Sequence, residues 1–364
     1  MTADVLVVGG GPAGLATALA ARRRGLAVTV LERARPPIDK ACGEGIMPDG
    51  VAALRALGVT PPGVPFRGIR YRDERGEAAA RFPGGPGLGV RRTTLHAALV
   101  AAAEAAGVEL RWGSRVEAVG LDGAVTTAGG TLRADWVVGA DGLLSRVREQ
   151  SGLAGRPARR RRFGVRRHYR LAPWTDMVEV HWRDGVEAYV TPVAADEVGV
   201  AMLWGGGGDF DGLLARFSEL AGRLAGAETA SRDRGAGPFR QRVRGVARGR
   251  LALVGDAAGY LDALTGEGLG LALQQAAALA EALAGGDLRP YARACRRLRR
   301  LSDGFTELLL LCERRPALRR RVVRELGRRP ELFARLLGVH ARQLPVRAVA
   351  TPGLAGMLVG LFRA

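Results

Sequence analysis

Cysteine is scarce in this chain of 364 residues: Cys42, Cys295 and Cys312 are its three cysteines, and no two of them form a CxxC pair. This spacing excludes a disulfide framework and a cysteine metal site, and it fits reduced thiols. No charged segment with an apolar stretch precedes the first expected strand, and no uncharged run approaches 18 apolar residues. We therefore expect a cytoplasmic protein with no signal peptide, membrane span or metal.

Lysine is almost absent: Lys40 is the only one among 55 lysine and arginine residues, and the net charge is +19. Such a charge favours nucleic acid or an anionic surface, but no RNP-like or helix-turn-helix pattern accompanies the arginines, so we expect no nucleic-acid partner. We interpret the arginine cluster 156–170 as a solvated inter-domain segment, with a site for an anionic group as the alternative. The cluster 289–347 is amphipathic, which predicts a solvated helical face or, alternatively, a peripheral membrane contact.

What the chain does contain is a glycine turn between an apolar strand at 5–8 and a helical pattern. Gly9 permits a tight turn, Gly11 lets a pyrophosphate approach the backbone, and Gly14 allows the helix to pack closely on the strand. The amides of the helix N-terminus then point at the phosphates. This pattern predicts a dinucleotide cofactor, and Ala13 in the same turn is a predicted contact.

A second apolar strand at 28–31 ends in Glu32. A carboxylate at this position accepts hydrogen bonds from the ribose hydroxyls of a dinucleotide, and its charge disfavours a 2′-phosphate. Arg33 follows it and is a further predicted cofactor contact. These residues fit NAD as well as FAD.

Three later segments favour FAD. Asp141 lies in GADGLLSRVR, after an apolar strand, and Asp256 ends the strand pattern LALVGD. Arg92 begins RTTL, an RxxL segment. The three segments resemble those of the flavoprotein monooxygenase and geranylgeranyl reductase superfamily. The resemblance implies that Asp141 lies near the pyrophosphate, that Asp256 binds the ribityl chain and that Arg92 contacts the cofactor.

The segment TGEGLG opens a helix rich in Ala, Leu and Gln. Gly266, Gly268 and Leu269 would therefore present amides and the positive helix end to the pyrimidine side of the flavin, where they stabilise its anionic reduced form.

The segment 39–46, DKACGEGI, resembles the KxCGG loop of geranylgeranyl reductases, which implies that Lys40, Cys42 and Gly43 lie beside the flavin. Lys40 is either a compact ammonium that a guanidinium cannot replace or a lysine without a role. We interpret Cys42 as a small packing residue.

The order of patterns predicts an α/β fold: a Rossmann-like FAD-binding domain, an inserted antiparallel-sheet substrate domain and a C-terminal helical region. Strand-like runs occupy 163–171, 177–182, 187–193 and 198–204, with a further hairpin at 69–82. We place the FAD-binding domain at 1–66, 91–156 and 248–290, the substrate domain at 67–90 and 157–247, and the helical region at 291–364.

Acid–base candidates are Lys40, Tyr189 and His181, with His168, Asp262 and Glu267 as further candidates. Tyr189 stands where geranylgeranyl reductases carry the tryptophan of a YxWxFP motif, but Glu187 and Thr191 replace its flanking aromatics. This difference opposes saturation of a long isoprenoid chain.

The first functional hypothesis is an FAD-dependent monooxygenase that acts on an apolar aromatic or polyketide-like small molecule. We expect NAD(P)H as its electron donor. Only one dinucleotide fingerprint is present, which fits a nicotinamide that binds transiently and equally fits a reductase with another electron donor. The alternatives are an FAD-dependent carbon–carbon double-bond reductase and a flavin-binding scaffold without activity. A halogenase is disfavoured because WxWxIP is missing, and the sequence sets no oligomeric state.

Overall fold

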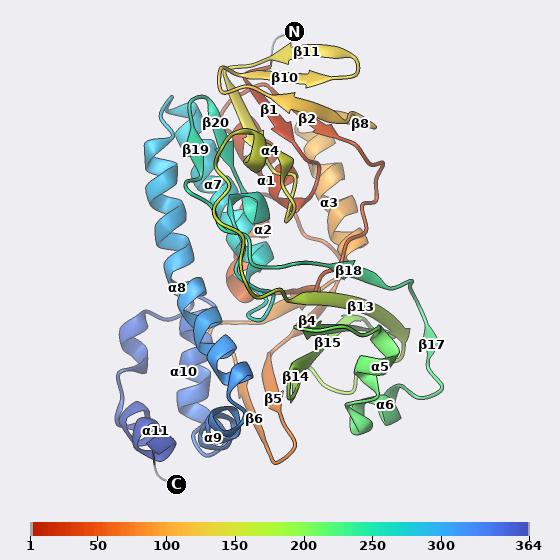
Figure 1. The fold of residues 1–364 in the computed structure, drawn as a ribbon, viewed down its shortest axis with the longest axis vertical. Coiled ribbons are helices and arrows are strands. Elements are labelled where there is room, and N and C mark those ends of the chain that lie inside the picture. Colours follow the sequence, from red (N-terminus) through yellow and green to blue (C-terminus); the bar gives the residue numbers. More distant parts are fainter. Residues whose placement is uncertain (1–2, 363–364) are drawn as a thin grey trace.

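The computed structural model describes residues 3–362 and contains two large sheets, with one long helix running beside both (Figure 1). The N-terminal sheet has six strands in the order β19-β20-β12-β1-β2-β8, all parallel except the β19–β20 pair. The strand β1, VLVV, is buried along its whole length, as expected of a parallel sheet covered on both faces. The six strands are β19 (Ala247–Arg248), β20 (Leu251–Leu253), β12 (Trp136–Gly139), β1 (Val5–Val8), β2 (Val28–Glu32) and β8 (Glu109–Trp112).

Different elements cover the two faces of this sheet. One face packs against the helices α1 (Pro12–Arg22), α3 (Arg92–Ala105) and α7 (Gly268–Ala284). The other face packs against α4 (Arg146–Gln150) and a three-stranded antiparallel meander, β9 (Val116–Val119), β10 (Ala124–Thr127) and β11 (Gly130–Arg133). The meander was not predicted. It takes the place of a covering helix because its alternating apolar residues bury one side of a small sheet.

The second sheet contains the four strands predicted from 163–204 and the predicted hairpin at 69–82. Its order is β17-β13-β16-β15-β14-β5-β6, and β18 also pairs with β13. It is antiparallel, as predicted, apart from the parallel pair β14–β5. These two strands come from distant segments, so no hairpin turn forces them to run in opposite directions. The strands are β17 (Glu228–Thr229), β13 (Phe163–Arg170), β16 (Glu197–Trp204), β15 (Val186–Ala194), β14 (Val178–Arg183), β5 (Gly68–Arg72), β6 (Glu77–Arg81) and β18 (Arg234–Ala236).

The two faces of β15 have different surroundings, since side chains alternate along a strand. Val186, Ala188 and Val190 pack on the outer face against α5 (Phe210–Leu214) and α6 (Ser218–Leu224). Glu187, Tyr189 and Thr191 therefore face inward, toward the first sheet and the loops at its edge.

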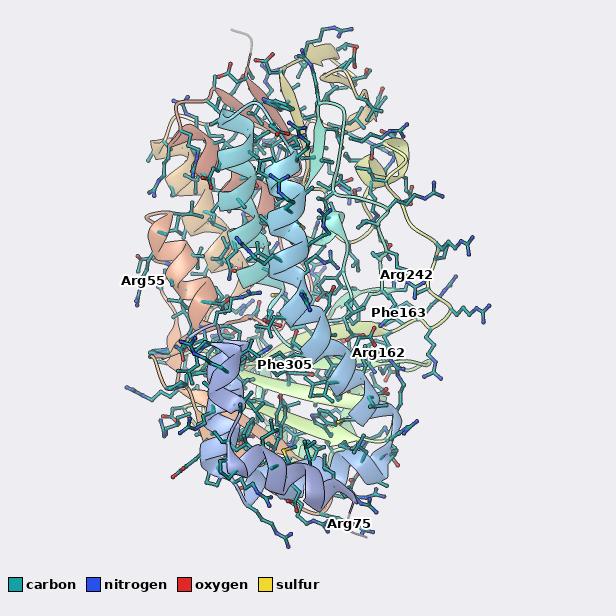
Figure 2. The ribbon with its side chains drawn as sticks, turned by 90° about the vertical axis from the view of Figure 1, so that its left-hand side faces the viewer. Arg55, Arg75, Arg162, Phe163, Arg242 and Phe305 are labelled. Carbon is teal, nitrogen blue, oxygen red and sulfur yellow. The ribbon has the colours of Figure 1, made fainter. Side chains whose placement is uncertain are left out.

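The chain from residue 268 onward is mostly helical, as predicted. The helix α8 (Arg289–Arg314) runs along both sheets, and α9 (Pro316–Gly327) and α10 (Pro330–His340) pack on β6 (Figures 1 and 2). The predicted solvated face is wrong for Arg319, which is 1% exposed and pairs with Asp184 at 2.9 Å. The remaining elements are η2 (Val346–Val349), α11 (Pro352–Phe362), η1 (Gly255–Ala258), α2 (Pro48–Ala56) and the small sheet β3 (Gly45–Ile46), β7 (Gly87–Gly89) and β4 (Val64–Phe66). Among residues 3–362, no helix combines the length and the apolar character that crossing a membrane requires.

Candidate functional site

The three fingerprint glycines lie at the carboxyl end of β1, and each has a different steric environment. A Cβ on Gly9 would lie 2.4 Å from the Ala140 oxygen, and a Cβ on Gly14 would lie 1.9 Å from the Gly9 oxygen. Gly9 also has a φ of +115°, which favours glycine. Beside Gly11, in contrast, the nearest atom is Nη2 of Arg92 at 3.7 Å. Gly9 and Gly14 thus serve close packing, whereas Gly11 opens onto space that fits an FAD pyrophosphate, beside a cation.

Glu32 lies next to this turn, at the end of β2. Its carboxylate accepts hydrogen bonds from the amides of Gly10 and Ala34, both at 2.8 Å. Gly10 is a further residue that the fingerprint needs, because a Cβ there would lie 2.7 Å from the Trp112 ring and 2.9 Å from Glu32 Cβ. The carboxylate is therefore fixed where an adenosine ribose is expected.

His96 is a buried residue of this region that sequence reasoning missed. Its Nε2 lies 2.8 Å from the Gly10 oxygen, and its Nδ1 accepts from the Ile38 amide at 3.4 Å. Burial lowers the pKa of His96, and the carbonyl partner requires a proton on Nε2. His96 ties the glycine turn to the loop after β2. Its position one helical turn after Arg92, in RTTLH, was the available signal.

Asp256 lies in η1, directly after β20. Gly255 adopts a φ of +62°, and its amide donates to Oε1 of Gln275 at 2.9 Å. Burial raises the pKa of Asp256, and the positive charges of Arg92 and Lys40 oppose this shift. The structure thus brings Arg92, Lys40 and Asp256, predicted from three separate segments, to one place.

Asp141 and Arg148 shape the loops around Asp256. The carboxylate of Asp141 accepts from the Ser145 hydroxyl and from the Val147 amide, the latter at 3.1 Å, and so begins α4. The buried guanidinium of Arg148 donates to the backbone oxygens of Asp256 and Ala257 at 3.3 and 3.2 Å. In this arrangement both side chains hold backbone in place.

The loop 39–44 approaches the same region from the side of β13. Lys40 is exposed, and its Nζ lies 3.8 Å from the position of a Cβ on Gly142. Burial raises the pKa of the Cys42 thiol, which agrees with a packing residue. Thr191 of β15 donates to the Gly43 oxygen at 2.9 Å, so this loop contacts the inner face of the second sheet.

Glu44, in the same loop, links it to β13 and α3. It has a φ of +59°, is 2% exposed, and accepts from the Arg92 amide at 2.8 Å. It also pairs with Nε2 of the fully buried His168, whose Nδ1 lies 3.0 Å from Nη1 of Arg166. The segment 156–170 is therefore not wholly solvated as predicted: Arg166 is 1% exposed and pairs with Asp39.

Tyr189 projects from the inner face of β15 toward the loop before α7. Its hydroxyl donates to the Leu264 oxygen at 3.0 Å, and it lies 3.3 Å from Oε2 of Glu187. Burial raises the pKa of Tyr189 well above its usual value, so the phenol stays neutral.

His181 is not brought together with Tyr189. It lies on the outer face of the sheet, where its Nε2 is 3.1 Å from Glu179 and its ring meets Phe217 edge-on. The alternation of side chains along β14 separates it from the inner face.

The remaining predicted cofactor contacts lie at the start of α7, in α1 and after β2. Gly266 has a φ of +67°, and Gly268 and Leu269 form the first turn of the helix. Ala13 lies in the first turn of α1, and a Cβ on Gly255 would be 2.7 Å from its Cβ. Arg33 follows β2 and is exposed.

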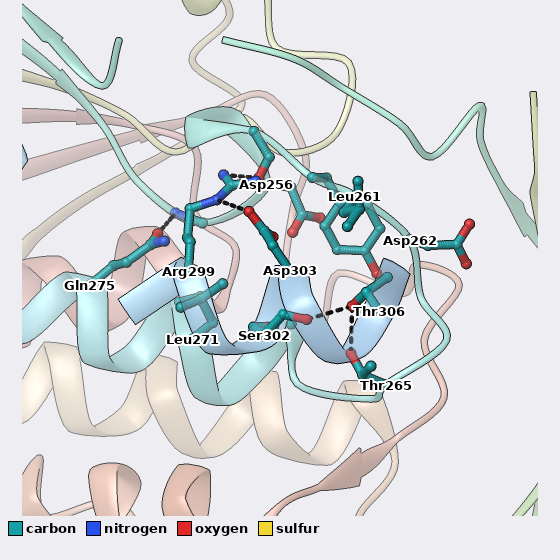
Figure 3. Close-up of a pocket in the computed structure, with 15 residues that line it drawn as sticks. Asp256, Leu261, Asp262, Thr265, Leu271, Gln275, Arg299, Ser302, Asp303 and Thr306 are labelled. Atoms are coloured by element: carbon teal, nitrogen blue, oxygen red, sulfur yellow. Dashed lines mark hydrogen bonds and ion pairs between the residues drawn. The ribbon is translucent and has the colours of Figure 1, made fainter. Parts of the chain in front are cut away.

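A small pocket, partly open to solvent, lies between the loop 255–268 and α8 (Figure 3). Asp256, Asp262, Thr265, Asp303 and Thr306 are among its lining residues. Glu267 is buried nearby and accepts from Ser302 at 2.8 Å.

Residues 2–202 match the protein family described as FAD binding domain. The chain is 31% identical to a menaquinone reductase of Mycobacterium tuberculosis over 317 residues, which cover 79% of this chain and 78% of that protein. It is 32% identical to the para-nitrophenol 4-monooxygenase of a Pseudomonas species over 318 residues, 77% of each chain. A flavoprotein/dehydrogenase of Cytophaga hutchinsonii has the same fold, with a TM-score of 0.81 over 98% of each chain at 17% identity. The glycine turn with its open cradle, the residues that gather around Asp256 and these matches agree: the chain belongs to the FAD-binding domain family and is an FAD-dependent oxidoreductase.

Proposed function

We propose that this protein is an FAD-dependent monooxygenase that hydroxylates an apolar aromatic or polyketide-like small molecule. One observation carries the proposal: the inner face of β15 contacts loops on both sides of the predicted flavin site. Thr191 bonds to Gly43 in the loop 39–44, and Tyr189 bonds to Leu264 in the loop before α7. A substrate held between this face and the cofactor is shielded from water, which such an oxygen transfer requires.

The chain supplies binding, orientation and proton handling, while FAD supplies redox chemistry with dioxygen as the oxidant. Gly11 and Arg92 would receive the pyrophosphate, and the amides at Gly266 and Gly268 would face the flavin. The neutral phenol of Tyr189 can donate a hydrogen bond. The overall balance is one substrate C–H, one dioxygen and one NAD(P)H with a proton, giving one C–OH, one water and NAD(P)⁺.

The similarity to a para-nitrophenol 4-monooxygenase, which extends over 77% of each chain, supports this class of reaction. We further propose that NAD(P)H is the electron donor and that it binds transiently. Within residues 3–362, one parallel sheet with one glycine turn is present, so the nicotinamide would have no dinucleotide-binding sheet of its own.

A reductase is the second candidate, because the menaquinone reductase covers 79% of the chain at 31% identity. In that reaction a hydride and a proton add to the two carbons of a double bond, and Tyr189 or Lys40 would be the proton donor.

Labelled dioxygen distinguishes the two candidates. The FAD-loaded protein is incubated with NADPH and either 1-naphthol or the quinone menadione, in ¹⁸O₂ or without oxygen, and products are weighed by mass spectrometry. A monooxygenase gives a naphthol product with one labelled oxygen and no such product without oxygen. Anaerobic formation of an unlabelled product heavier by two hydrogens, both of them on carbon and not on the oxygens as in the quinol, would instead establish the reductase.

A further inference from the structure

A buried cluster of charged side chains lies at the inner face of β15 and takes no part in the cofactor site described above. Arg162 lies at its centre, alongside α8 (Figure 2). Its Nη2 is 3.2 Å from Glu187, its Nε is 2.9 Å from Asp262 and its Nη1 is 3.2 Å from Glu313. The carboxylates thus come from β15, from the loop before α7 and from α8, and one guanidinium joins the three.

When its carboxylates are ionised, this cluster carries a net negative charge. Three carboxylates face one guanidinium, and the side chains of Glu187 and Asp262 are 1% and 3% exposed, so water does little to offset their charge. Tyr189 and Tyr71 are the other titratable groups that face Glu187, and both are neutral because burial raises their pKa values. The cluster can therefore accept a hydrogen-bond donor or a cation, and it repels an anion.

Two buried acceptor atoms in the cluster have no partner among the described residues. They are Oε1 of Glu187 and Oδ1 of Asp262; one donor, Nη1 of Arg162, also lacks a hydrogen bond there and faces Glu313 only as an ion pair. An acceptor that is buried without a donor is unfavourable, so a site of this kind is completed by a ligand that donates.

The cluster lies beside the region where the cofactor and substrate would meet. Asp262 is at the end of the pocket opposite Gln275 (Figure 3), and Tyr189 joins Glu187 to Leu264 in the loop that leads into Gly266. Glu187 also occupies a position at which the YxWxFP motif carries an aromatic residue. A carboxylate with a free oxygen thus stands where the related motif has an apolar wall.

From this geometry we infer that Glu187 and Asp262, held by Arg162, form a substrate-recognition subsite that takes a neutral hydroxyl or amino group on an aromatic ring and rejects carboxylates. Glu187 is its proton acceptor: the O–H bond of the substrate breaks, an O–H bond forms at Oε1, and this proton passes to solvent after the reaction. The inference rests on the proposed monooxygenase function, since proton removal makes the ring more electron-rich toward the oxygen that dioxygen supplies.

The acid strength of Glu187 suits this role. Burial raises its pKa to about 7, Asp262 and Glu313 add to the increase, and Arg162 opposes it. Near neutral pH both protonation states are populated, which is the condition for efficient proton transfer in either direction.

The test compares two ligands with the same ring system, 1-naphthol and 1-naphthoate, by titrating each into the FAD-loaded protein and following the flavin absorbance. We expect the naphthol to bind at least about tenfold more tightly, because an anion meets like charges in the subsite. In Glu187→Gln the preference for naphthol over naphthoate should fall several-fold. In the double variant Glu187→Gln with Asp262→Asn, naphthoate should bind about tenfold more tightly than it binds to the natural protein. Naphthol binding should follow the ionisation of a group near pH 7 in the natural protein and lose this dependence in Glu187→Gln.

The control is Glu179→Gln, which changes a buried carboxylate on the outer face of the same sheet and should leave the preference unchanged. FAD content and thermal melting report whether each variant is folded. Equal binding of the two ligands, binding of neither, or an unchanged preference in a folded Glu187→Gln would overturn the inference. The failure of this inference can be told apart from the failure of the proposed function. If the protein prefers naphthol over naphthoate but gives no labelled product, the subsite stands and the monooxygenase function is wrong. If it gives labelled product without this preference, the monooxygenase function stands and the subsite is wrong.

Discussion

Adding one methyl group at Gly11 and one at Gly14 should have opposite consequences, although the two residues belong to the same turn. A Cβ on Gly11 would have its nearest neighbour at 3.7 Å, an ordinary contact, and the backbone there is extended at φ −74°. Gly11→Ala should therefore leave the FAD-free protein as stable as before, or more stable by about 0.4–1 kcal/mol, because alanine restricts the unfolded chain. A Cβ on Gly14 would lie 1.9 Å from the Gly9 oxygen, so the helix must move away from the strand.

Overpacking of this severity costs about 3 kcal/mol, which lowers Tm by roughly 4 °C in a chain of this length. FAD affinity should change differently. In Gly11→Ala the methyl group occupies the space of the pyrophosphate, and a cost of about 1.4–2.8 kcal/mol weakens binding by roughly ten- to hundredfold; Gly11→Val should abolish binding.

The assay is thermal melting of the FAD-free proteins, followed by titration with FAD while the quenching of flavin fluorescence is measured. Natural FAD affinity in Gly11→Ala would refute the assignment of the cradle. A Tm in Gly14→Ala equal to that of the natural protein would refute the steric argument.

Asp256→Ala should remain folded and bind FAD about ten- to hundredfold more weakly, because one charge-assisted hydrogen bond is worth about 1.5–3 kcal/mol; an unchanged Kd would remove this residue from the site. Glu187 has a pKa raised to about 7 from 4.5, so its contribution to stability is lost as pH rises between these values, and melting of Glu187→Gln should show less loss from pH 5 to 8. Burial raises the pKa of Glu179, but hydrogen bonds from His181 and Trp174 outweigh this effect and lower it to about 2. The contribution of Glu179 to folding stability is therefore present above pH 4.5, and Glu179→Gln should melt at a lower temperature than the natural protein at pH 7. A crystal soaked in NADPH should show the nucleotide weakly held at the inter-domain surface or not at all, and an ordered site with its own glycine turn would contradict this. The protein should sediment with phosphatidylserine vesicles at low salt through the arginines of its C-terminal helices and through Leu308 and Leu358, which are 53% and 50% exposed. The double variant Leu308→Ser with Leu358→Ser should bind these vesicles more weakly. Equal binding of the natural protein to neutral vesicles would contradict this membrane contact.

The predicted cofactor-binding residues of this protein lie in short, contiguous segments of the sequence. Gly9, Gly11 and Gly14 lie within one turn, and their roles follow from local rules for close approach of backbone to backbone and to phosphate. Continuous apolar runs such as residues 5–8 predict buried parallel strands, and alternating runs between 163 and 204 predict the second sheet, because side-chain periodicity is a local property. The choice of FAD over NAD came from the resemblance of further short segments to those of a flavoprotein superfamily.

The substrate side depends on the tertiary structure. Arg162 looked like part of a solvated arginine segment, yet it joins carboxylates from three elements that lie as far apart in sequence as Glu187 and Glu313. His181 and Tyr189 looked equivalent as acid–base candidates, and only the pairing of the strands assigns them to opposite faces of one sheet. Glu44 and His168 likewise meet across 124 residues. The sequence by itself determines each local conformation and each group's chemistry. Burial, charge balance and pKa arise from which distant segments pack together, and the proposed substrate subsite rests on this packing.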